Sequence, residues 1–173
     1  ASLADLVELT QEYQSSINRF YIDRLRFHKY RPTGGILPFM FNDSNPAVQW
    51  SIIDYWRVPK RSYYAMRQAF SPQYLFTLLN ADTHPAGRPI DLPLYAVNDA
   101  HQPAPVAITA RVLGPDGEVA RVERQITLPP DCMATEVDRL RLTPERPGEY
   151  RLALALANGA ELLLEHEYLL KVT

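Results

Sequence analysis

The chain has 173 residues, of which 46% are hydrophobic and 22% are charged. These values are ordinary for a globular protein of one domain, or of one domain plus a smaller piece. The net charge of -2 gives no general attraction to nucleic acid or to an anionic membrane, so neither is expected as a partner. No apolar run is long enough to span a bilayer, and no signal peptide is recognisable.

Cysteine and histidine give no sign of disulfide or metal chemistry. The single cysteine, Cys132, cannot form an internal disulfide, is compatible with the cytoplasm and is expected to be a buried or half-buried thiol. The four histidines are scattered along the sequence without the spacing of metal ligands. We therefore predict no metal and no other cofactor, and the compartment stays open.

The first segment predicts a helix. Its apolar residues recur at the helical period and so share one face: Tyr13, Ile17, Phe20, Tyr21 and Leu25. The other side carries charged residues, which we expect to be solvated: Arg19, Asp23, Arg26 and Lys29. Pro32 and the pair Gly34–Gly35 then end the helix.

The next segment predicts a buried strand and a second helix. Gly35–Phe41 is a continuous apolar run of strand length, the pattern of a strand buried on both faces. Pro38 within it indicates a bulge or an irregular strand. Pro59 then introduces a helix from Lys60 to about Phe70.

The rest of the chain predicts seven strands. They are Tyr74–Leu79, Ile90–Val97, Val106–Leu113, Val119–Leu128, Thr135–Leu142, Glu149–Ala157 and Glu161–Val172. Turn residues at 113–118 and 157–160 are typical of hairpins. Seven short strands with regular turn signals favour an immunoglobulin-like β-sandwich. The alternating Glu161, Glu165 and Glu167 are expected on its solvent face.

One set of motif residues in the first 72 stands out: Gly34–Asp43, Pro46, Trp50–Tyr55, Pro59–Lys60 and Tyr63–Tyr64. On these residues the segment resembles glycoside hydrolase family 2, with the β-mannosidase-like branch the nearest in character. The resemblance implies that residues 1–72 are the last strand and helices of a (β/α)8 barrel, also called a TIM barrel. Residues 73–173 then form the sandwich that follows the barrel. The expected fold class is therefore mainly β with an α/β N-terminal piece.

The same resemblance implies chemistry on a carbohydrate substrate. Family members are retaining β-glycosidases, which need two carboxyl groups about 5 Å apart as acid/base and nucleophile. In the family both are glutamates on earlier barrel strands, so no catalytic residue is expected in this chain. The chain alone is therefore predicted to be inactive, as the C-terminal part of a larger enzyme.

Four residues are candidates for contact with a sugar: Phe39, Asn42, Asp43 and Trp50. Asn42 and Asp43 follow a barrel-type strand, where barrel enzymes place functional residues. Asp43 has an equally weighted alternative, capping of the following turn, and for Trp50 core packing under the loop is the simpler interpretation. Of their neighbours, Asp54 is expected to hydrogen-bond loop backbone, and Lys60 to form an ion pair or face solvent.

The sequence departs from the family pattern where sugar contact is expected. Phe39 and Asn45 stand where the family has tryptophan, and Met40 stands where it has glutamine. Because indole faces stack on the apolar faces of sugars, these changes indicate either a different substrate or a function lost at this end.

Two further interpretations remain open. In the first, the sandwich is a non-catalytic module that binds carbohydrate or protein or has a structural role. In the second, the chain is a free-standing scaffold protein. With few aromatic residues and no tryptophan in that region, a structural role is favoured over a sugar platform. We also expect the barrel-derived segment either to fold back on the sandwich or to self-associate, because an isolated barrel strand presents unpaired edges.

Overall fold

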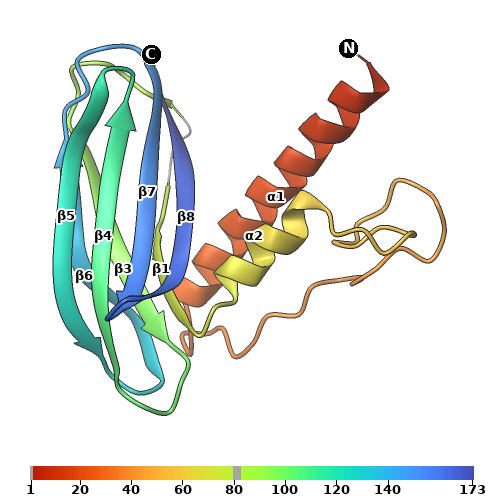
Figure 1. The fold of residues 1–173 in the computed structure, drawn as a ribbon, viewed down its shortest axis with the longest axis horizontal. Helices are drawn as coiled ribbons and strands as arrows, with labels where there is room; N and C mark the ends of the chain where they lie inside the picture. Colours follow the sequence, from red (N-terminus) through yellow and green to blue (C-terminus); the bar gives the residue numbers. More distant parts are fainter. Residues whose placement is uncertain (1, 80–82) are drawn as a thin grey trace. The chain divides into compact units, whose positions relative to one another are not determined.

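A computed structural model describes residues 2–79 and 83–173. The chain divides into two compact units, unit 1 (Ala1–Phe70) and unit 2 (Ser71–Thr173), and each is described by itself. Figure 1 shows the helices of unit 1 and the strands of unit 2.

Unit 1 contains the two predicted helices, α1 (Leu3–Phe27) and α2 (Arg61–Ala69). Helix α1 begins with a capping box, in which Ser2 and Asp5 each accept a hydrogen bond from the other's backbone N–H. This arrangement satisfies two N–H groups that a helix start otherwise leaves unpaired. In the described part of the chain, no helix is both long and apolar enough to cross a membrane.

The two helices meet through polar side chains. Asn18 donates a hydrogen bond to the Ser62 hydroxyl at 2.6 Å, and Arg19 donates one to Gln68 at 2.8 Å. The guanidinium of Arg26 reaches the carbonyl of Ala69 at 2.6 Å.

The prediction for the two faces of α1 is therefore wrong. Asp23 and Arg26, expected in solvent, are buried, whereas Tyr13 and Tyr21 of the apolar face are exposed. The period identified two faces correctly, but it could not tell which of them α2 would cover.

The predicted strand at Gly35–Phe41 is absent from the structure. Residues 35–41 have no regular secondary structure, and Leu37, Phe39 and Phe41 are exposed. Met40 has φ 59°, a left-handed conformation that costs a non-glycine residue about 1 kcal/mol. The physical reason is that a central parallel strand takes its ladder hydrogen bonds from neighbouring strands. No strand of the described residues pairs with this segment, in which only the Phe41 carbonyl accepts, from the N–H groups of Ile52 and Ile53.

Unit 2 is a β-sandwich of two sheets (Figure 1). Its strands are β1 (Gln73–Thr77), β2 (Thr83–His84), β3 (Ile90–Asn98), β4 (Ala104–Gly114), β5 (Gly117–Leu128), β6 (Cys132–Leu142), β7 (Gly148–Asn158) and β8 (Glu161–Val172). One sheet has the order β1-β3-β6 and the other β2-β8-β7-β4-β5. All seven predicted strands are confirmed, and the two-residue β2, which pairs with β8 in parallel, was missed.

The core of unit 2 lies between the sheets. Alternate residues of β4 and β7 are buried, as expected of strands with one face on the core. His166 on β8 lies 2.7 Å, through Nε2, from the carbonyl oxygen of Leu75 on β1, and its ring stacks on Tyr74. This contact joins the two sheets. The three glutamates of β8 are exposed as predicted, and Cys132 is half-buried.

Both predicted hairpins are present, and one of them supports a buried tyrosine. Gly114 pairs with Gly117 across a two-residue loop, and Asn158 pairs with Glu161. The hydroxyl of Tyr150 donates to the carbonyl of Arg146 at 2.9 Å, while its ring lies against Gly114. A Cβ on Gly114 would stand 2.6 Å from the Tyr150 ring, so this position has no room for a side chain.

We expect Gly114→Ala to lower the free energy of unfolding by about 1–3 kcal/mol, the usual cost of overpacking. Tyr150 is buried, so its ring cannot move aside without losing the bond to Arg146. Thermal and urea unfolding measure the effect. Gly34→Ala is the control, because a Cβ at Gly34 meets nothing within 4 Å. Equal stabilities of the two variants would contradict the prediction.

Candidate functional site

The candidate residues lie in the segment that connects the two helices of unit 1. Two isolated bridges shape it: Asn42 pairs with Ile53 in parallel, and Ile53 pairs with Pro59 in antiparallel. The backbone N–H of Asp43 also donates to the carbonyl of Ile53 at 2.9 Å. Residues that are ten positions apart in sequence are therefore held side by side.

Asp43 is the centre of this segment. Its residue is 2% exposed, and both carboxylate oxygens have partners. Oδ1 accepts a hydrogen bond from the Ser51 hydroxyl, and Oδ2 forms an ion pair with the Lys60 ammonium at 2.9 Å. The Lys60 ammonium also donates to the Ser51 hydroxyl at 3.1 Å, so the three side chains form a closed network, the Asp43–Ser51–Lys60 cluster.

The network fixes the charge state of Asp43. Burial by itself raises the pKa of the carboxyl, but the hydrogen bond from Ser51 and the ion pair with Lys60 outweigh it and hold the pKa below its ordinary value of 3.8. Lys60 is the N-cap of α2 and makes no side-chain cap bond. A cation there is unfavourable for the helix dipole, and the carboxylate of Asp43 offsets that cost.

The predictions for the two neighbouring residues are confirmed. Lys60 forms the ion pair expected of it. Asp54 accepts a hydrogen bond from the backbone N–H of Val58 at 2.8 Å, which closes the turn that contains Tyr55 and Trp56.

The four candidate sugar contacts differ in their exposure. Phe39 and Trp50 are 78% and 77% exposed, so the expectation that Trp50 packs in the core is wrong. Asn42 is half-buried and donates to the carbonyl of Asp43 at 3.2 Å. Asp43 is buried and fully engaged. Of the four candidates, the two aromatic side chains are thus exposed, the amide is half-buried and the carboxylate is buried.

Asn45, which stands where the family has tryptophan, takes part in the loop itself. Its side-chain oxygen accepts hydrogen bonds from Ser44 and Gln49. A polar link within the loop therefore occupies the place of an indole.

Sequence reasoning missed Ser51 and Gln14. Ser51 is fully buried and links Asp43 to Lys60. Gln14 on α1 donates hydrogen bonds to the carbonyls of Trp50 and Ser51 at 2.8 and 3.1 Å. Nothing in the sequence marked them, because each becomes informative only when its partner lies beside it.

The two units differ sharply in how many large apolar side chains they expose. Among the described residues, the large apolar side chains that are exposed belong to unit 1 with three exceptions, Val119, Leu162 and Leu169. Unit 2 therefore leaves few large apolar side chains exposed. Unit 1 presents the kind of apolar surface that usually marks an interaction site.

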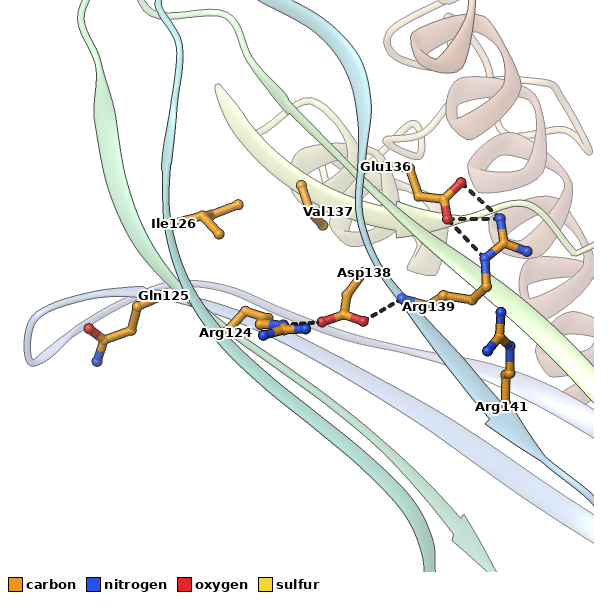
Figure 2. A pocket seen from close by; sticks show the side chains of 8 residues that line it. All are labelled: Arg124, Gln125, Ile126, Glu136, Val137, Asp138, Arg139 and Arg141. Carbon is orange, nitrogen blue, oxygen red and sulfur yellow. Dashed lines mark hydrogen bonds and ion pairs between the residues drawn. The ribbon is translucent and has the colours of Figure 1, made fainter.

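Unit 2 has a shallow groove between the edge strands β5 and β6, which Figure 2 shows with its lining side chains. Arg124 forms an ion pair with Asp138, and Arg139 binds Glu136 and also Asp91. The arginine charges are thus matched by carboxylates of the same unit, and no aromatic side chain lines the groove. The groove has neither the unmatched charge nor the ring surface that would mark a ligand.

Two other site types lack support in the described residues. The exposed large apolar residues of unit 2 include no aromatic, so the sandwich presents no stacking platform for sugars. No group of three or more His, Cys, Asp or Glu residues is arranged to hold a metal ion.

The chain was compared with known proteins. No family model matches the chain. Over 72 residues, 40% of its length, the chain is 33% identical to β-mannosidase B of Aspergillus niger, of which it spans 8%. The resemblance to glycoside hydrolase family 2 is confirmed. The chain corresponds to a small part of this relative.

Solved structures agree in fold. The β-D-mannosidase from Dictyoglomus thermophilum matches 98% of the chain with a TM-score of 0.78 and 22% identity. The exo-chitosanase of Amycolatopsis orientalis matches 99% with a TM-score of 0.76 and 16% identity. The chain spans 20% of each of these proteins. At such identities the likeness shows the fold alone, and it confirms the mainly β class with a β-sandwich.

We expect Lys60→Met to lower the free energy of unfolding by about 2 kcal/mol at pH 7, between the values for exposed and fully buried ion pairs. The substitution leaves the buried Asp43 carboxylate without its cation. Urea unfolding measures the loss, and adding Asp43→Asn should restore part of it. Arg61→Met, which breaks exposed ion pairs with Glu8 and Glu12, is the control and should change little. If the two single variants behave alike, the cluster does not stabilise unit 1.

The stabilisation by Asp43 should depend on pH in one direction. Its pKa is lowered in the folded chain, so its contribution is complete well above pH 3.8 and is lost as the pH falls through the folded pKa. The stability difference between wild type and Asp43→Asn should thus be constant from about pH 5 to 7 and shrink below about pH 4. Urea unfolding from pH 3 to pH 7 tests this, and a difference that grows on acidification would contradict it.

Proposed function

We propose that the chain is the C-terminal part of a retaining, β-mannosidase-like β-glycosidase that hydrolyses β-linked sugars. The observation that carries the proposal is the 33% identity to a β-mannosidase over 72 residues. The shared fold with a second β-mannosidase supports it. Carbohydrate is then the substrate of the whole enzyme, to which this chain contributes pocket-lining residues and an accessory sandwich.

Unit 1 is on this proposal the end of a (β/α)8 barrel. Two observations support that role. Its large apolar side chains are exposed, as expected of a surface that normally packs on neighbouring barrel elements. Its apolar segment 35–41 also lacks ladder partners, as expected of a strand separated from the strands beside it. The same exposed surface makes self-association of the chain by itself a proposal as well.

The candidate residues have different roles in this proposal. Exposed Phe39 and Trp50 supply ring faces for sugar stacking, and Asn42 supplies an amide for a hydroxyl group. Asp43 acts indirectly, since both of its carboxylate oxygens are already engaged. Its part is to hold the loop that carries Trp50.

Asp43 is also unsuited to the chemistry of the reaction. Because its pKa is lowered, the carboxyl is ionised near neutral pH and cannot donate a proton as a general acid. As a nucleophile it would have to give up Ser51 and Lys60. Asp43 is therefore not one of the two catalytic carboxylates on this proposal.

The sandwich has a structural role on this proposal. Its described surface offers no exposed large aromatic side chain, and the arginines of its groove are paired with carboxylates. The alternative of a carbohydrate-binding module would need a ring platform.

We expect the chain alone to release no nitrophenol from 4-nitrophenyl β-mannoside, because the carboxylate at the candidate site, Asp43, is already engaged by Ser51 and Lys60. Calorimetric titration with β-1,4-mannobiose should nevertheless show weak, saturable binding, and Trp50→Ala should abolish it by removing a stacking face.

The matched control is Trp56→Ala, which removes another exposed tryptophan and should leave mannobiose binding unchanged. Turnover that disappears in Asp43→Ala would overturn the assignment of the catalytic carboxylates to other parts of the enzyme. Binding that survives Trp50→Ala would remove Trp50 from the site.

A further inference from the structure

The backbone that carries Trp50 is held from two sides. From α1, the side-chain amide of Gln14 donates to the carbonyls of Trp50 and Ser51. From the start of α2, the Lys60 ammonium donates to the carbonyl of Gln49 at 3.4 Å. Three consecutive carbonyls, of residues 49 to 51, thus accept hydrogen bonds from side chains distant in sequence.

The donors on both sides are fully used. An ammonium has three N–H donors, and Lys60 contacts three oxygens, on Asp43, Ser51 and the Gln49 backbone. The amide group of Gln14 has two N–H donors, and it has two carbonyl acceptors. The cluster and Gln14 together form a clamp around residues 49–51.

The backbone of residues 49–51 is held, whereas the Trp50 side chain on it is exposed. The indole of Trp50 is 77% exposed, while the backbone beneath it is fixed by side-chain hydrogen bonds. Backbone that is fixed before a ligand arrives lowers the ordering cost of binding, because fewer torsions around the ring remain to be ordered.

We propose that Gln14 is a positioning residue for sugar recognition, which acts by donating two hydrogen bonds to the backbone of the segment that bears Trp50. The inference rests on the proposed function for the identity of the ligand. The clamp itself rests on the geometry of unit 1.

Gln14 differs in this respect from the other glutamine of the same helix that faces the α2 side. Gln11 accepts a hydrogen bond from the backbone N–H of Arg61 at 3.1 Å, whereas Gln14 donates. Glutamate has nearly the shape of glutamine but is an acceptor only when ionised. Gln11→Glu therefore keeps its contact, and Gln14→Glu loses both of its own.

The test uses the full chain with Trp56→Phe, so that Trp50 is its sole tryptophan. Time-resolved fluorescence anisotropy reports the mobility of Trp50, and fluorescence titration with β-1,4-mannobiose reports affinity. We expect Gln14→Glu to add a fast anisotropy decay and to weaken mannobiose binding about tenfold, the effect of losing one to two hydrogen bonds. Gln11→Glu should match the parent in both, and Gln14→Lys, which restores a donor, should recover most of the loss.

The outcomes separate the clamp from the proposed function. If Gln14→Glu leaves the anisotropy decay at the level of Gln11→Glu, the clamp is overturned. If Gln14→Glu adds a fast anisotropy decay but the parent chain binds no mannobiose, the clamp stands and the proposed sugar contact fails. If Gln14→Lys is as loose as Gln14→Glu, Gln14 serves as packing and not as a donor. Should Gln14→Glu fail to fold, Gln14→Leu provides the same comparison without the added charge.

Discussion

A buried carboxylate is the constraint on which the organisation of unit 1 depends. Asp43 is almost inaccessible to water, and an ionised group in such a place must be paired and hydrogen-bonded. Lys60 and Ser51 meet this requirement, and in doing so they join the segment after α1 to the start of α2. The loop between Asp43 and Ser51 is closed by the same contacts.

The two units show opposite ways of reaching a stable structure. Unit 2 encloses its apolar side chains between two sheets and joins the sheets through His166 and Leu75. Unit 1 joins its helices through hydrogen bonds such as those of Asn18 and Arg26, while most of its large apolar side chains face outward. Since apolar burial is the main favourable term in folding, unit 2 draws more of its stability from this term than unit 1 does.

The candidate residues of unit 1 fit this division. Trp50 is exposed on backbone that side-chain hydrogen bonds hold, and the carboxylate of Asp43, a candidate for substrate contact from the sequence, is instead engaged by Ser51 and Lys60. The same loop differs from the family where Asn45 replaces an indole with an amide that bonds Gln49.

The sequence by itself determined the sandwich, because period-2 burial and turn residues are local signals, and all seven predicted strands are present. It also determined the two helices, the roles of Asp54 and Lys60, and the family resemblance. Only the tertiary structure decided that α1 packs by its polar side, that Trp50 is exposed, and that residues 35–41 form no strand. It likewise revealed Ser51 and Gln14. These features depend on which surface meets which partner, and a periodic pattern identifies a face without naming what covers it.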